Sequence, residues 1–278
     1  MTQMIDAGQN PELANSLIAS AVAETPAAAE VVVPPIDRQP DCNVTLLAGL
    51  INQLEGTTTT DAVVRELTGA DEEVISSPTV ARSTAKFLQA VTGRGTVSIG
   101  EGKPKGAEFD GLLIGDRDLL LIAIRKVTYG PEVELQTVCP YCGDEDKEFV
   151  YDLNDVEVRP LARVEDALYG FTLELPSGRT AKVSLPRAAD QDALLTSTGK
   201  NLAELDTLML SRIVFQLDGD IVIGDAKLRN LSVKDRRALL KEVNERTPGP
   251  RLGEAKRTCR ACEKEFDLGI GLLDIFRA

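Results

Sequence analysis

Alternating apolar and polar residues predict one β-hairpin near the start of each half of the chain. In the first half, NVTLLAGL and TDAVVREL flank the polar turn LEGTTTT. In the second half, FTLELPSGRTAKVSL is expected to turn at Pro176, where proline, serine and glycine follow one another. These residue types favour tight turns between alternating segments. Two hairpins are therefore expected, far apart in the sequence.

Apolar residues at helical spacing predict helices after each hairpin. The predicted helices of the first half are GADEEVISS, TVARSTAKFLQAV and DRDLLLIAIRKVTYG. Those of the second half are RAADQDALL, LAELDTLMLSRIVFQL and SVKDRRALLKEVNERTPG, the last with Ser232 as its N-cap. Short strands are predicted at TVSIG, VELQTV, EFVYDL and DIVIG. The mixture of hairpins and helices predicts an α+β fold.

The two halves match when one is shifted along the other. With a shift of 119 residues, DRDLLLIAIRKVTYG overlays DRRALLKEVNERTPG and Asp116 falls on Asp235. With a shift of 120 residues, the cysteine pair at 139 and 142 falls on the pair at 259 and 262. A nearly constant offset is typical of a tandem duplication. We therefore predict two similar lobes, each with a hairpin, helices and one cysteine pair.

The predicted domain boundaries follow from this duplication. Residues 1–40 are rich in Ala, Pro and Gln and have no sustained apolar face, so they are predicted to form a flexible or extended arm. The first α+β repeat is predicted at residues 41–158 and the second at residues 159–278. The arm and the apolar C-terminal run IGLLDIFRA are the segments expected to contact partners. Packing of the C-terminal run against its own cysteine hairpin is the alternative.

Four of the five cysteines form two Cys-x-x-Cys pairs, Cys139 with Cys142 and Cys259 with Cys262. Thiolates at this spacing sit on a tight turn, and two such turns supply the four ligands of a tetrahedral zinc ion. The sequence therefore predicts one structural zinc ion held by all four cysteines. Because no position around such an ion stays open, a catalytic role is not expected. The remaining Cys42 is expected to be a buried or inert thiol.

A thioredoxin-like redox pair and unligated thiols are the alternatives for these cysteines. A redox Cys-x-x-Cys normally opens a helix that follows a strand. Here Cys142 is followed by Gly143, acidic residues and the strand-like EFVYDL, which favours metal binding.

Charge and composition restrict the function classes. The 278 residues carry a formal net charge of −13 and include no histidine. An acidic surface repels phosphate and anionic lipid, so neither a nucleic-acid partner nor a membrane is expected. The absence of histidine removes catalysis by Ser-His and Cys-His pairs, so an enzyme would have to work with carboxylates, lysines or a metal bound by thiolates. Arg117, Arg125, Arg236 and Arg237 on the paired helices are expected to be surface partners of carboxylates.

Three stretches carry a resemblance to a known family: VRELTGADEEVI, LLIGDRDLLLIAIRKVTYGPEVELQTVCPYCG, and LDGDIVIGDAKLRNLSVKDRRALLKEV before CRAC. They resemble the baseplate hub and hub-assembly proteins of T-even-like contractile-tailed phages, from about residue 41 to the C-terminus. The resemblance implies a structural virion protein in or near the central hub of the tail baseplate, assembled in the host cytoplasm and without enzymatic activity. It implies multiple copies per particle and contacts with hub, wedge or tail tube proteins.

Two other functions stay open at this point. The first is a hub assembly factor that is absent from the mature particle. The second is a cellular zinc-ribbon adaptor, which the acidic composition and the shortage of aromatic residues disfavour as a nucleic-acid binder.

Overall fold

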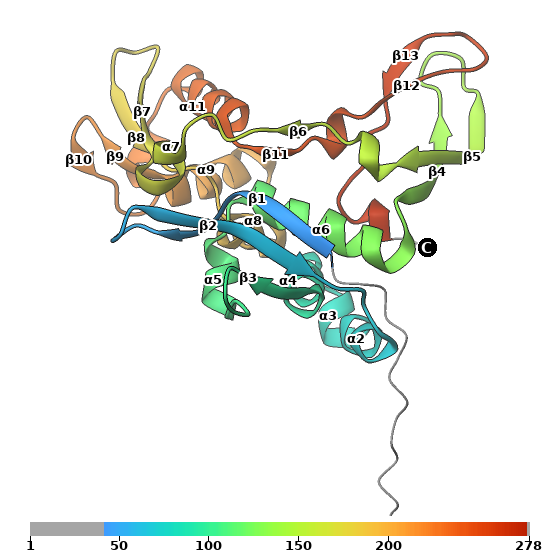
Figure 1. Ribbon diagram of the computed structural model, residues 1–278. Helices are drawn as coiled ribbons and strands as arrows, with labels where there is room; N and C mark the ends of the chain where they lie inside the picture. Colours follow the sequence, from blue (N-terminus) through green and yellow to red (C-terminus); the bar gives the residue numbers. More distant parts are fainter. Residues whose placement is uncertain (1–41, 277–278) are drawn as a thin grey trace, which may run out of the picture. The chain divides into compact units, whose positions relative to one another are not determined.

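The computed structural model describes residues 42–276, which form helices and small antiparallel sheets (Figure 1). The α+β class predicted from the sequence is therefore confirmed. The predicted arm, residues 1–40, lies outside the described residues. Within 42–276, none of the helices has the length and apolar character required to cross a membrane.

The first half begins with a three-stranded sheet in the order β1-β2-β3. Its strands are β1 (Cys42–Asn52), β2 (Thr57–Val64) and β3 (Thr96–Ile99). Between β2 and β3 lie α2 (Gly69–Ile75), α3 (Pro78–Ala81) and α4 (Thr84–Gly95), and after β3 come α5 (Gly106–Gly111) and α6 (Ile114–Tyr129). Aliphatic side chains of β2, α4 and α6 pack into one core, including Val64, Leu88, Leu120 and Ile124.

The second half contains a four-stranded sheet in the order β10-β9-β8-β7. Its strands are β7 (Phe171–Glu174), β8 (Thr180–Val183), β9 (Val214–Leu217) and β10 (Asp220–Ile221). The helices are α7 (Val164–Tyr169), α8 (Ala188–Thr196), α9 (Leu202–Ile213), α10 (Ala226–Arg229) and α11 (Val233–Arg246). A separate core holds this half together and includes Val183, Leu210, Leu217 and Leu239.

Two predicted helices have different boundaries in the structure. The predicted helix at residues 79–91 is divided into α3 and α4, because Ser83 leaves the helical conformation and caps α4 by accepting a hydrogen bond from Lys86 N. The predicted helix at residues 202–217 was wrong at its end, where residues 214–217 form β9 instead. Val214 and Leu217 are buried there as β9 pairs with β8. Sheet pairing thus overrides the helical spacing of this apolar run.

The pairing of strands recurs between the halves. In the first half β3 follows α4 and pairs with β2, and in the second half β9 follows α9 and pairs with β8. In both cases the register shifts just before the last residue pair. The corresponding pairs are Ala62–Ile99 and Val64–Thr96 in the first half, and Ala181–Leu217 and Val183–Val214 in the second. These recurrences are consistent with a tandem duplication, which stays a prediction.

Two of the four arginines are buried instead of lying on the surface. Arg117 is only 2% exposed, and Arg125 is buried and donates to the backbone oxygens of Gly130 and Glu132. Arg117 still pairs with a carboxylate, that of Asp192, while Arg236 is half-buried and donates to the backbone oxygen of Ala203 on α9. Desolvation of Arg117 and Arg125 is tolerated because each guanidinium finds hydrogen-bond acceptors. Helical spacing could not distinguish these two arginines from surface ones.

The C-terminal apolar run packs against its own chain. Ile275 in the 3-10 helix η4 (Asp274–Phe276) is fully buried, and its backbone oxygen accepts a hydrogen bond from Arg125 Nε. The Phe276 ring meets the Phe87 ring edge-on, with centroids 5.7 Å apart. Ile275 is therefore covered by the protein itself, while Leu272, Leu273 and Phe276 are half-buried.

The two halves meet backbone to backbone at a pair of glycines. Gly115 lies in the first turn of α6, and Gly249 lies in β11 (Gly249–Pro250), which pairs with β6 (Val158–Arg159). A Cβ atom added to Gly115 would lie 2.1 Å from Pro248 O. Gly249 has φ of +132°, a conformation that favours glycine, and a Cβ there would lie 2.5 Å from Gly115 Cα. This contact therefore requires glycine on both sides.

We predict that Gly115→Ala lowers the free energy of unfolding by about 1–3 kcal/mol, because the added methyl group forces the two backbones apart. Gly93→Ala is the matched control, since Gly93 also lies in a helix but its Cβ would meet nothing within 4 Å. The control should raise stability by about 0.5–1 kcal/mol, the usual preference for alanine in a helix. Urea unfolding followed by circular dichroism measures both variants, and equal effects would contradict the close contact.

Candidate metal centre

Two short hairpins carry the four predicted ligands. Cys139 and Cys142 lie in the turn between β4 (Glu132–Val138) and β5 (Glu145–Asp152), and Cys259 and Cys262 lie between β12 (Lys256–Thr258) and β13 (Glu265–Asp267). The two hairpins lie together at the upper right of Figure 1, one green and one red. Cysteines far apart in the sequence are thus brought to one place.

Both turns have the same hydrogen bonds. Gly143 N donates to Cys139 O at 2.9 Å, and Glu263 N donates to Cys259 O at 3.0 Å. Gly143 and Glu263 both have positive φ, 74° and 57°. The second turn therefore adopts this conformation without the proline and glycine that mark the first, and a non-glycine residue takes the left-handed position.

The four sulfur atoms form one group. Cys139 Sγ lies 3.7 Å from Cys262 Sγ, and Cys142 Sγ lies 3.6 Å from Cys259 Sγ. All four sulfur atoms lie within 4.8 Å of one another. Four sulfurs bound tetrahedrally at about 2.3 Å from zinc would be separated by about 3.8 Å. The arrangement is therefore compatible with a zinc site and has the ligand set that this metal prefers.

The environment of the sulfurs differs from ligand to ligand. Cys139 and Cys259 are buried, Cys262 is half-buried and Cys142 is exposed. Burial raises the pKa of Cys139, but the backbone N–H groups of Tyr141 and Cys142 and the neighbouring thiols lower it to about 7. The thiolate form is thus favoured at Cys139. At Cys142 a hydrogen bond from the backbone of Asp144 lowers the pKa, but burial and the three other thiols raise it to about 12.

An arginine that the sequence analysis did not identify joins the two hairpins beside the cysteines. Arg257 of β12 donates to Asp146 Oδ2 at 2.6 Å and to Thr137 Oγ1, and its guanidinium lies 4.3 Å from the centre of the Phe149 ring. Arg257 is buried, and it holds the pKa of Asp146 below its ordinary value. Thr137 and Arg257 each stand two residues before the first cysteine of their own pair. The equivalent positions of Thr137 and Arg257 are a sequence signal from which this contact could have been found.

Cys42 does not take part in this group. It lies at the start of β1, before the buried part of the strand begins, and its side chain is exposed. The expected burial is therefore wrong, while the alternative of an inert thiol stays a prediction.

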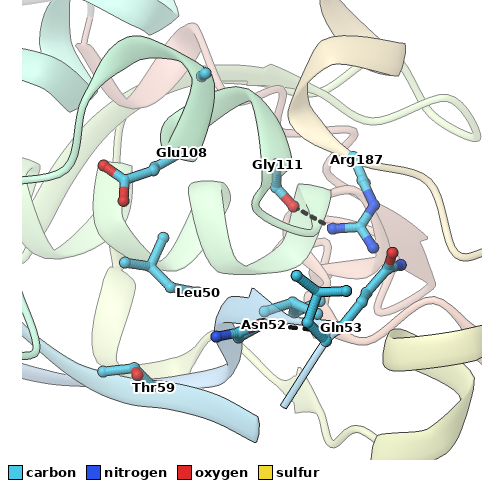
Figure 2. A pocket seen from close by; sticks show the side chains of 10 residues that line it. Leu50, Asn52, Gln53, Thr59, Glu108, Gly111 and Arg187 are labelled. Atoms are coloured by element: carbon cyan, nitrogen blue, oxygen red, sulfur yellow. Dashed lines mark hydrogen bonds between the residues drawn. The ribbon is translucent and has the colours of Figure 1, made fainter. Parts of the chain in front are cut away.

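A separate hollow of about 660 Å³ lies beside the tip of the first hairpin (Figure 2). Its ionisable residues have structural partners. Arg187 donates to Gly111 O at 2.6 Å, and Glu108 accepts a hydrogen bond from Lys105 N at the start of α5. Both charged groups thus hold backbone in place, and the hollow is not a candidate catalytic site.

Part of the chain matches a known protein family. Residues 99–195 match the family described as T4 bacteriophage base plate protein. The matched segment runs from the last residue of β3 to α8 and includes the first cysteine pair, while the second pair lies outside it. Comparison with curated proteins and with solved structures gave no match. The family match supports a relation to T4-like baseplate proteins and a place in the virion tail.

We predict that Arg257→Gln lowers the melting temperature, because it removes the ion pair with Asp146 and the stacking on Phe149. Lys256→Gln is the matched control on the same strand, since Lys256 pairs with Glu265 at an exposed position. Exposed ion pairs contribute little, so the control should melt close to the wild type. Differential scanning calorimetry compares the variants, and a larger effect of the control would contradict a stabilising role for Arg257.

Proposed function

We propose that this chain is a structural component of a contractile phage tail baseplate, in or near the central hub, and that it has no catalytic activity. The observation that carries the proposal is the match of residues 99–195 to the base plate family. Neighbouring baseplate proteins of the hub, the wedge or the tail tube would be its partners, and multiple copies would assemble in each particle.

The metal centre supports a structural role. The four clustered cysteines would occupy all positions of a tetrahedral ion, which would leave no position for a water molecule or a substrate. Cys142 and Cys259 are 117 positions apart, and a metal bound to both closes a long loop. Closing a long loop restricts the unfolded chain and thereby stabilises the fold. We therefore propose a zinc ion at Cys139, Cys142, Cys259 and Cys262 that joins the two halves.

The overall charge argues in the same direction. A formal net charge of −13 disfavours binding to a nucleic-acid backbone. The chain is thus expected to meet proteins instead of phage DNA. An acidic surface also favours partners that present basic residues.

We predict one zinc ion per chain in protein purified under reducing conditions without added metal. Cys259→Ser should reduce the zinc content and lower the melting temperature, because the metal loses a ligand and the long loop opens. Cys42→Ser should keep both at the wild-type level, since Cys42 lies outside the four-sulfur group. Elemental analysis by mass spectrometry gives the zinc content. Wild-type protein without zinc would contradict the metal centre while leaving the baseplate role open.

The place in the particle can be tested by quantitative mass spectrometry of purified phage baseplates. We expect the polypeptide at a stoichiometric copy number related to the symmetry of the baseplate. Its presence in assembly intermediates and absence from mature particles would contradict a structural role and support an assembly factor. Absence from both would point to a cellular protein.

A further inference from the structure

A cleft of about 280 Å³ lies between the start of α6 and the end of α11. Its walls are mostly aliphatic and come from both halves of the chain. They include Ile114, Pro186, Met209, Leu240, Val243 and Pro248. Asp118 is the acidic residue among those that line this cleft.

One oxygen of the Asp118 carboxylate lacks a donor. Asp118 as a residue is half-buried, but its Oδ1 atom is buried and accepts no hydrogen bond from residues 42–276. Asp116, two residues earlier on α6, accepts hydrogen bonds from the backbone N–H groups of Leu47, Ala48 and Gly49. A buried carboxylate oxygen without such donors is unfavourable, because it has lost its contact with water and forms no hydrogen bond in exchange.

The neighbouring cations do not neutralise this acid. Burial raises the pKa of Asp118 to about 7, and the charge of Arg117 only partly opposes the effect. Arg117 instead donates to Asp192 Oδ1 at 2.7 Å. Arg251 also lines the cleft, where its Nη2 atom donates to the backbone oxygens of Asn244 and Thr247 and its buried Nε atom has no partner among residues 42–276. Within the described part of the chain, no ion pair reaches Asp118.

We propose that this cleft binds a lysine or arginine side chain of a neighbouring protein, with its methylene groups against the aliphatic walls and its cation at Asp118. Long basic side chains bury an apolar stem and keep a charged end, which matches apolar walls around one acid. The net charge of −13 favours the approach of a basic partner segment. The identity of that partner as a baseplate protein rests on the proposed function, whereas the site itself does not.

The test compares two peptides that differ in one charge. Acetyl-Gly-Lys-Gly-amide carries the ammonium group, and the same peptide with norleucine has the apolar stem alone. Each is titrated into the ¹⁵N-labelled full chain, and binding is followed at the backbone amides of Gly115 and Gly249, which line the cleft. We expect the lysine peptide to shift both signals and to bind at least tenfold more tightly than the norleucine peptide.

Two variants test whether the negative charge of Asp118 causes the preference for lysine. Asp118→Asn keeps the shape of the side chain and should abolish the preference for lysine. Glu73→Gln removes an exposed acid on α2, away from the residues that line the cleft, and should leave the preference unchanged. Equal binding of both peptides, no shift of either glycine signal, or a loss of preference in the Glu73→Gln variant would overturn the proposal. The peptide comparison uses the wild-type chain, so it stands even if the Asp118→Asn variant fails to fold.

The proposed cleft and the proposed function are tested by different experiments, so one can be rejected without the other. Binding of the lysine peptide by a protein that is absent from baseplates would keep the cleft and reject the proposed function. A protein that is found in baseplates but binds the two peptides equally would keep the proposed function and reject the cleft as a site for a basic side chain.

Discussion

The contact between Gly115 and Gly249 is the constraint on which the rest of the structure depends. Because neither residue has a side chain, the first turn of α6 can approach β11 with backbone against backbone. This contact positions the segment that leaves α11, and from there the chain continues to β12 and the second cysteine pair. The same crossing places α6 beside α11 and so forms the walls of the cleft around Asp118. A side chain at either glycine would disturb both regions together.

Buried carboxylates at corresponding positions organise each half. Asp116 accepts the backbone N–H groups of β1, while its counterpart Asp235 accepts Ser177 N from the turn of the second hairpin. Asp71 pairs with Arg94, and its counterpart Asp190 pairs with Arg212. The aspartates at the start of α6 and α11 thus bind the backbone of a hairpin, while Asp71 and Asp190 join the start of one helix to the last turn of a later helix.

The candidate metal centre combines two kinds of attachment between the hairpins. The four sulfurs are grouped at distances suited to a tetrahedral ion, and Arg257 adds an ion pair and an aromatic contact next to them. The arginine contact needs no metal, so it can align the hairpins before an ion binds. Such preorganisation lowers the entropy lost when the metal joins two distant parts of the chain. A centre of this kind suits a protein that must keep its shape inside an assembly.

The sequence by itself determined the fold class, the two hairpins and the residues of the candidate metal centre, because alternation, turn residues and Cys-x-x-Cys spacing are local patterns. It failed where the outcome depended on residues distant in the chain. Val214 to Leu217 follow helical spacing but join a strand, and Arg117 looks like a surface residue but lies in the core. The pairing of Arg257 with Asp146 and the missing donor at Asp118 likewise appear only when distant segments meet. Hydrogen bonds and burial are satisfied in three dimensions, and only the tertiary structure decides which side chains find a partner.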